Sequence, residues 1–250
     1  MGRFESTVEF YTRYREPYSP RFFQRVSERI GLRGNESLLD VGCGPGLLAL
    51  GFAPYVGSCT GVDPEAAMVA AAKAAAAEAG VALRLRQGRI EDFAEAGPFD
   101  MVTIGRAIHW MDRERTLAVL ERIVSDSGRI VICGASSLET VPWAALYDEV
   151  RRSWASHANE TNYRLNGREW FANSKFREVD SVEAVTGQQV SIADLIGRAL
   201  SKSNTSTEVL GERRAEFEAE ITAALEPFAQ DGMLQEEIVA RARIFGRMGR

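Results

Sequence analysis

The sequence contains little of several residue types that mark particular classes of protein. It has three cysteines, Cys43, Cys59 and Cys133, and none of them has a partner at metal-ligand spacing. An odd number of cysteines and a polar, aromatic start to the chain are not typical of a secreted protein. We therefore expect a protein of the reducing cytoplasm that holds no metal.

Long apolar runs and clusters of basic residues are also missing from the sequence. No apolar run approaches the roughly 20 residues that a membrane helix needs. The 30 basic and 35 acidic residues give a formal net charge of −5, and the arginines are scattered along the chain. Because proteins that bind nucleic acids usually show a basic patch, we expect neither a nucleic acid nor a membrane as partner. We expect a monomer or a homodimer.

The pattern of residues 36–134 alternates between strands and helices. Strands are predicted at 37–41, 58–63, 81–88, 99–105 and 128–134, and helices at 47–55, 64–80 and 112–126. Alternation of this kind predicts an α/β fold with a parallel sheet and right-handed crossovers. An amphipathic helix is predicted ahead of the first strand, at 19–32.

The pattern is looser after residue 134. We predict helices at 142–155, 166–173 and 192–202, a strand at 176–191 and a closing strand at 236–246. The sequence has no internal repeat and no linker long enough to separate two domains. We therefore expect one domain over residues 1–250.

Two helix starts carry local capping signals. Asp63 is placed to cap the helix at 64–80, and Pro64 suits the first turn of that helix. Thr205 and Glu208 have the spacing of a capping box before a later helix. The apolar residues of that later helix fall on one face: Leu210, Phe217, Ile221 and Leu225.

A glycine-rich turn follows the first predicted strand and contains Gly42, Gly44 and Gly46. Glycine permits positive φ and lets the backbone approach a ligand closely, and ligands of parallel sheets bind beyond the carboxyl ends of the strands. The spacing is G-x-G-x-G, and Leu47 stands where the dinucleotide pattern G-x-G-x-x-G has its third glycine. Asp40, just before the turn, would repel a pyrophosphate but can accept hydrogen bonds from an ammonium group.

The segment LLDVGCGPG (38–46) resembles the first motif of class I S-adenosylmethionine-dependent methyltransferases that act on small molecules. Further segments match the motifs of this family in order. GVDPEAAM (61–68) resembles the second motif, QGRIEDF (87–93) the segment that holds the adenine, and FDMVTIGRAIHWMD (99–112) the fourth-strand motif in its HW variant. That variant is similar to methyltransferases of the trans-aconitate type. GRIVICG (128–134) matches the fifth strand.

The resemblance implies a particular architecture. It is a Rossmann-like, seven-stranded, mostly parallel sheet with helices on both faces, an antiparallel last strand and a helical lid over the active site. Residues 1–33 would then form the lid, residues 34–134 the cofactor-binding core, and residues 135–250 the helices and closing strands on the acceptor side.

The resemblance also assigns residues to the cofactor S-adenosyl-L-methionine, whose product is S-adenosyl-L-homocysteine. Asp63 would accept the two ribose hydroxyls, and Met68 would pack on the adenine. Asp63 as a helix cap, Met68 as core and Glu91 as a surface charge are the structural alternatives. Arg89 departs from the family, which often has Asp there. The implied cofactor residues are Asp40, Gly42, Gly44, Gly46, Asp63, Pro64, Met68, Arg89, Ile90, Glu91, Gly105, Arg106 and Ala107.

Candidate acceptor residues lie in two places. His109 and Trp110 follow the fourth strand, and His109 is placed either to accept a proton from the acceptor or to hold the turn by bonding to the backbone. The N-terminal segment EFYTRYREPYSPRFF (9–23) resembles a Tyr- and Arg-rich lid, although its aromatics would equally pack as an ordinary surface helix. Its candidate substrate residues are Tyr11, Tyr14, Arg15 and Tyr18.

The leading hypothesis is a methyltransferase that acts on O or N, or on C, of a small-molecule acceptor, with carboxylate O-methylation as one candidate. A nicotinamide-dependent oxidoreductase is the rival enzyme, and a non-catalytic protein that binds S-adenosylmethionine is the rival binding module. A nucleic-acid methyltransferase is disfavoured because the Asn-Pro-Pro-aromatic signature is absent from the sequence.

Overall fold

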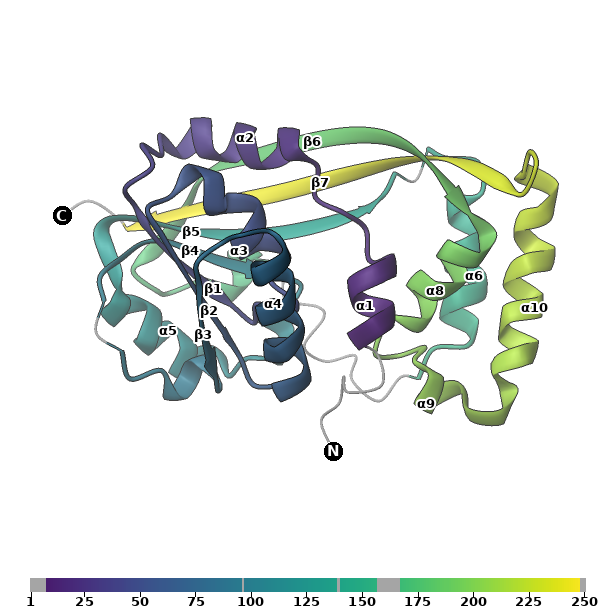
Figure 1. Cartoon of the computed structure of the whole chain (residues 1–250), viewed down its shortest axis with the longest axis horizontal. Helices are drawn as coiled ribbons and strands as arrows, with labels where there is room; N and C mark the ends of the chain where they lie inside the picture. The colour runs from purple at the N-terminus through teal and green to yellow at the C-terminus, as the bar shows by residue number, and fades with distance from the viewer. Residues whose placement is uncertain (1–7, 96, 139, 157–166, 248–250) are drawn as a thin grey trace. The chain divides into compact units, whose positions relative to one another are not determined.

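The computed structural model describes residues 8–95, 97–138, 140–156 and 167–247 of the chain (Figure 1). Its contacts divide the chain into two compact units. The core unit comprises Tyr18–Gly134, Thr161–Ala184 and Ala240–Arg250, and the helical unit comprises Met1–Pro17, Ala135–Glu160 and Val185–Val239. A single domain over residues 1–250 stays a prediction.

The described strands form a seven-stranded mixed sheet in the order β3-β2-β1-β4-β5-β7-β6, with β7 antiparallel. The predicted α/β, Rossmann-like fold is therefore confirmed. The strands are β1 (Ser37–Val41), β2 (Ser58–Asp63), β3 (Leu83–Gln87), β4 (Phe99–Gly105), β5 (Val124–Ser137), β6 (Phe176–Ser191) and β7 (Met233–Arg247). Strand β1 pairs in parallel with both β2 and β4. The strand order therefore reverses beside β1, which is where open α/β sheets bind their ligands.

Strand β5 is longer than its predicted range of 128–134. It begins at Val124, which pairs with Phe99 of β4, and the register of the two strands shifts before Met101. From the pair Phe99–Val124 to the pair Met101–Arg129, β4 advances by two residues and β5 by five, so the irregularity accommodates three extra residues in β5. Residues 124–126, which were predicted to end the helix at 112–126, therefore belong to the strand, and that helix ends at Ile123.

Helices cover both faces of the strands in the core unit. Leu39 and Val41 of β1 belong to a buried cluster with α5, whereas Asp40 between them accepts a hydrogen bond from the Ala49 amide of α3. Successive side chains of a strand point to opposite faces, so α3 and α5 lie on opposite sides of β1 (Figure 1). The helices of this unit are α2 (Pro20–Ile30), α3 (Leu47–Phe52), α4 (Ala66–Glu78), α5 (Arg113–Ile123) and α7 (Gly167–Trp170).

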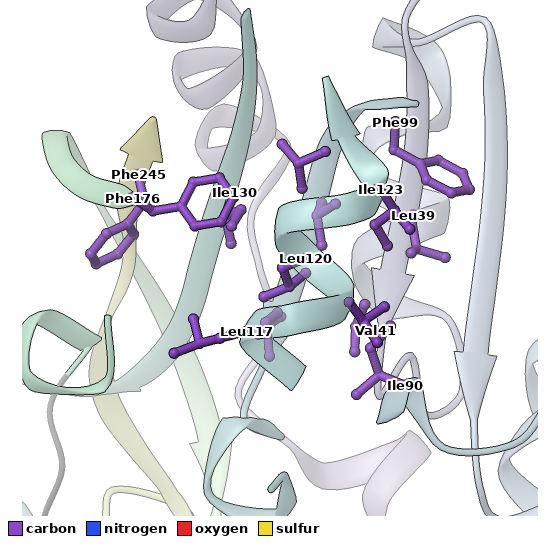
Figure 2. Close-up of a cluster of buried hydrophobic side chains, with 14 of the residues drawn as sticks. Leu39, Val41, Ile90, Phe99, Leu117, Leu120, Ile123, Ile130, Phe176 and Phe245 are labelled. Atoms are coloured by element: carbon purple, nitrogen blue, oxygen red, sulfur yellow. The ribbon is translucent and has the colours of Figure 1, made fainter. Parts of the chain in front are cut away.

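The α5 side of the sheet carries the main hydrophobic cluster of the core unit. Figure 2 shows Leu117, Leu120 and Ile123 of α5 among the side chains of this cluster. The cluster draws on distant parts of the chain, because Phe176 of β6 and Phe245 of β7 join it. The other labelled members are Leu39, Val41, Ile90, Phe99 and Ile130.

A second buried cluster lies in the helical unit. It contains Leu210, Phe217, Ile221 and Leu225, the four residues predicted to share one helix face. They lie on two helices, because a 3-10 turn at Gly211–Arg213 separates Leu210 from the other three. The helices of this unit are α1 (Val8–Tyr14), α6 (Ala144–Ser153), α8 (Ile192–Leu200), α9 (Thr207–Leu210) and α10 (Arg214–Leu225). Among the described helices, none is long and apolar enough to span a bilayer.

Both predicted capping assignments are wrong. Helix α4 begins at Ala66 with Glu65 at its N-cap, because the Asp63 carboxylate belongs to the end of β2. Helix α9 is preceded by Ser206, and the Thr205 hydroxyl instead donates to the Ala199 carbonyl at 2.7 Å.

Candidate functional site

The glycine turn after β1 requires glycine for two separate reasons. Gly42, Gly44 and Gly46 have φ values of 64°, 53° and 88°, a region that side chains other than glycine rarely enter. The approach of neighbouring chain is also close, because a Cβ atom at position 42 would lie 2.5 Å from the Cβ of Ala107. The backbone of Gly42, just beyond β1, therefore packs directly against Ala107, just beyond β4.

Asp63, at the carboxyl end of β2, holds this turn. Its Oδ2 accepts from the Gly44 amide and its Oδ1 from the Glu65 amide, both at 2.9 Å. Burial raises the pKa of Asp63, and the two amides oppose that shift. A carboxylate has about four acceptor positions, so two of them are left for a ligand. The side chain is therefore oriented by the backbone and still able to accept two hydroxyl protons.

Asp40 lies on the α3 side of β1 and is 1% exposed. Its Oδ1 accepts from the Thr103 hydroxyl at 2.8 Å and its Oδ2 from the Ala49 amide at 3.2 Å. Burial raises the pKa of Asp40 to about 7, although both hydrogen bonds favour the ionised form. Asp40 therefore ties β1 to β4 and α3. A contact with a methionine ammonium group stays a prediction.

The segment after β3 shows where Arg89 and Glu91 lie. Both carboxylate oxygens of Glu91 accept from the Arg89 guanidinium, at 3.0 and 3.2 Å, and Oε1 also accepts from the Asp112 amide at 2.8 Å. Burial raises the pKa of Glu91, and these bonds more than reverse the shift, so the net change is downward. Glu91 thus links the segment after β3 to Asp112 at the start of α5. Met68 and Ile90 are buried, and Pro64 is exposed.

Gly105, the last residue of β4, and the residues that follow it lie beside α3 and the glycine turn. A Cβ at Gly105 would lie 2.6 Å from Cδ1 of Leu48, so the backbone passes close to α3. Arg106 has a left-handed φ of 55°, a strained conformation that is common at functional sites. Its guanidinium lies over the Tyr18 ring, 5.0 Å from the centroid. Tyr18 and Arg106 therefore lie together beside the end of β4.

His109 and Trp110 lie on a 3-10 turn, Ile108–Trp110, directly beyond β4. Their ring centroids are 4.9 Å apart, and the Trp110 amide donates to the Ala107 carbonyl at 2.9 Å. Both side chains are partly exposed. The turn thus places His109 four residues beyond Gly105, on the same strand end as the glycine contact.

The N-terminal candidates do not all lie in one unit. Tyr11, Tyr14 and Arg15 belong to the helical unit, and Tyr18 belongs to the core unit. The Arg15 guanidinium lies over the Tyr11 ring at 4.7 Å from its centroid. The Tyr14 carbonyl accepts from Arg198 at 3.2 Å. The cofactor candidates are all in the core unit.

Sequence reasoning missed two residues of this region. Thr103 is the hydroxyl partner of Asp40, and Gly61 lets β2 pass Cys43, whose Sγ would lie 2.9 Å from a Cβ there. Threonine in a buried strand is ordinary, so only the register of β1 and β4 reveals the pair. Among the described residues, no group of three or more histidine, cysteine or acidic side chains is placed to hold a metal ion.

Comparison with known proteins agrees with this geometry. Residues 39–132 match a family described as a methyltransferase domain. The ubiquinone biosynthesis O-methyltransferase of Pseudomonas paraeruginosa is 35% identical over 125 residues, which are 49% of this chain and 52% of that protein. The chain thus spans about half the length of the curated relatives it matches.

Two solved structures share the fold along most of the chain. A candidate type II methyltransferase of Anaeromyxobacter dehalogenans has a TM-score of 0.70 at 19% identity, covering 94% of this chain and 98% of the other. A Thiobacillus denitrificans methyltransferase in complex with S-adenosyl-L-homocysteine has a TM-score of 0.60 at 18% identity, covering 99% of both chains. At these identities the likeness is one of fold.

Proposed function

We propose that the protein is an S-adenosylmethionine-dependent methyltransferase with a small-molecule acceptor. One observation carries the proposal. Three left-handed glycines stand at the carboxyl end of β1, and the amide of the middle one, Gly44, is bonded to Asp63 at the end of β2. The match of residues 39–132 to a methyltransferase domain supports it.

The residues of the core unit fit the parts of this cofactor. Asp63 keeps two acceptor positions, which suit the two ribose hydroxyls. The apolar side chains of Met68 and Ile90 would border the adenine. Gly42, Gly44 and Gly46 would run beside the sugar and methionine, with Gly105, Arg106 and Ala107 at the methionine end. Because the Glu91 carboxylate is bonded to Arg89 and to Asp112, the adenine amine would meet it only at its remaining acceptor positions.

For methyl transfer, the protein mainly has to position S-adenosylmethionine and the acceptor relative to each other. Bound S-adenosylmethionine supplies a methyl group on a sulfonium, which is already activated. A bound acceptor would take this methyl group onto a lone pair, with S-adenosylhomocysteine as the other product, and a hydroxyl or amine acceptor would also have a proton to lose. We assign the proton of a hydroxyl or amine acceptor to His109, beyond β4, with Trp110 beside it as a substrate contact; an ionised carboxylate has no proton to lose, and His109 would then only contact it.

The atom that is methylated is a finer proposal. Oxygen is favoured because the Pseudomonas paraeruginosa relative is an O-methyltransferase. It matches about half of this chain. The HW sequence at 109–110, similar to the trans-aconitate type, favours a carboxylate oxygen in particular. A cytoplasmic location, a monomer or homodimer, and an action on neither membranes nor nucleic acids stay predictions.

The test combines two measurements on the full chain. We expect S-adenosylhomocysteine, and not NAD, to raise the melting temperature. We also expect label to pass from methyl-labelled S-adenosylmethionine to a small molecule of a metabolite extract. Stabilisation by NAD alone would establish the oxidoreductase instead. Tight binding of S-adenosylhomocysteine without transfer to any acceptor would establish a non-catalytic binding protein.

A further inference from the structure

Five charged residues gather in the helical unit, where α1 ends beside α8. Arg15 and Glu16 directly follow α1, Asp148 and Arg151 lie on α6, and Lys202 follows α8. Three of the five are cations. Burial is unusually high for charged side chains, since Glu16 is 4% exposed, Arg151 is 8% exposed, and the Lys202 side chain is 25% exposed.

Two of the three cations have a carboxylate partner. Arg151 Nε lies 3.2 Å from Asp148 Oδ1, and Lys202 Nζ lies 3.7 Å from Glu16 Oε1. The second distance is longer than that of a charge-assisted hydrogen bond, so Glu16 and Lys202 form an ion pair without a close hydrogen bond. The charges of this group therefore sum to one excess positive charge.

Arg15 is the cation without a carboxylate in the described part of the chain. One of its terminal nitrogens donates to the Ser201 carbonyl at 3.0 Å, and its guanidinium lies over the Tyr11 ring. Its Nε is buried and has no hydrogen-bond acceptor among the described residues. A buried donor of this kind is unfavourable until an acceptor reaches it. Ser201 precedes Lys202 in the chain, so both cations stand at the same end of α8.

The pKa of Lys202 responds to the other charges of this group. Burial lowers the pKa of Lys202 to about 8, and the charges of Arg151 and Arg15 lower it further, while Glu16 and Asp148 raise it. Like charges act in this way only at short range in a folded protein. An anion would relieve this repulsion.

We propose that Arg15 and Lys202 form a binding site for an anionic ligand, a carboxylate or a phosphate, within the helical unit. An anion there accepts the unmet proton of Arg15 Nε and balances the excess positive charge, and charge-assisted hydrogen bonds of this kind are strong. The anion site goes beyond the proposed function and does not depend on it, because binding of the anion is measured without methyl transfer.

The experiment titrates succinate and inorganic phosphate separately into the full chain at constant ionic strength. The variants are Arg15→Gln and Lys202→Gln. Arg13→Gln is the matched control, because it removes the same charge two residues before Arg15, at an exposed position of α1. Loss of a charge-assisted hydrogen bond predicts an affinity at least about ten-fold weaker in the two site variants and unchanged in the control.

The outcomes separate the sources of the anion and the two proposals. Binding of succinate alone indicates a ligand with a carboxylate, and binding of phosphate alone indicates a phosphorylated ligand. The proposal is wrong if wild type binds neither anion, or if Arg15→Gln binds them as wild type does, or if Arg13→Gln loses as much affinity. S-adenosylhomocysteine is titrated into every variant as a check of folding. If it fails to bind wild type while succinate binds, the proposed function falls and the anion site remains.

Discussion

The carboxylate of Asp63 accepts a hydrogen bond from the backbone amide of Gly44, 2.9 Å away. Asp63 ends β2, and Gly44 lies in the turn that follows the neighbouring parallel strand β1, 19 positions earlier in the sequence. The bond fixes a turn whose three glycines have no side chains of their own. The same carboxylate keeps two acceptor positions for a ligand, so the structural and the proposed binding roles of Asp63 coexist.

The contact between Gly42 and Ala107 gives the first prediction. Gly42→Ala would place a Cβ 2.5 Å from that of Ala107 at a φ of 64°, so two strand ends must move apart. We expect binding of S-adenosylhomocysteine to weaken at least about ten-fold, because a displaced turn loses hydrogen bonds worth about 1.5 kcal/mol or more. Isothermal titration calorimetry measures this.

The double variant Gly42→Ala with Ala107→Gly is the control for that prediction. It removes the clash and leaves the backbone strain, so we expect it to recover part of the lost affinity. The close approach would have no importance if the single variant bound the ligand as wild type does, or if the double variant recovered nothing.

The second prediction concerns Asp40 and the pH dependence of stability. Its pKa is about 7 in the folded protein against 3.8 for the free side chain, so folding takes up a proton between these values. The stability that this gives is complete below about pH 4 and is lost as the pH rises through about 7. The loss between about pH 5 and about pH 8 is at most about 3 kcal/mol.

Asp40→Asn removes this titration while keeping the shape of the side chain. The amide oxygen can accept from the Ala49 amide, and the amide nitrogen can donate to the Thr103 hydroxyl oxygen. We therefore expect the variant to gain stability relative to wild type as the pH rises, measured by urea unfolding at both pH values. An equal difference between the two proteins at both pH values would show that Asp40 does not titrate there.

The third prediction separates the two roles of His109. A residue that accepts a proton from the acceptor acts on kcat, by about 10² or more, while S-adenosylhomocysteine still binds. His109→Ala should therefore lower kcat and leave the affinity for S-adenosylhomocysteine unchanged. His109→Asn, which keeps hydrogen bonding without the basicity, should be equally slow. Full activity in His109→Asn would favour the role in holding the turn.

Local pattern was sufficient for the inner strands. β1, β2 and β4 match their predicted ranges at both ends, because short apolar runs bounded by turn residues are typical of buried strands. It was insufficient where a distant contact decides. Asp63 followed by Pro64 has the local form of a helix start, yet its carboxylate also accepts from Gly44 in the turn after β1. Thr103 was unremarkable for the same reason.

The candidate site was predicted unevenly. Gly42, Gly44 and Asp63 were found by their sequence motifs, and the structure brings them together. Arg15 was found only as part of an aromatic and basic segment. Its neighbours Lys202 and Arg151 come from elements far along the chain, and no local pattern links them to it.

The most direct test of the account is a titration of S-adenosylhomocysteine into wild type and Asp63→Asn. Asparagine has one side-chain acceptor oxygen for two backbone amides and offers a ribose only a neutral partner. Asp126→Asn, at a fully exposed acid of the same unit, is the control. The account predicts binding by wild type and the control, and affinity at least about ten-fold weaker in Asp63→Asn. Equal binding by wild type and Asp63→Asn would contradict it.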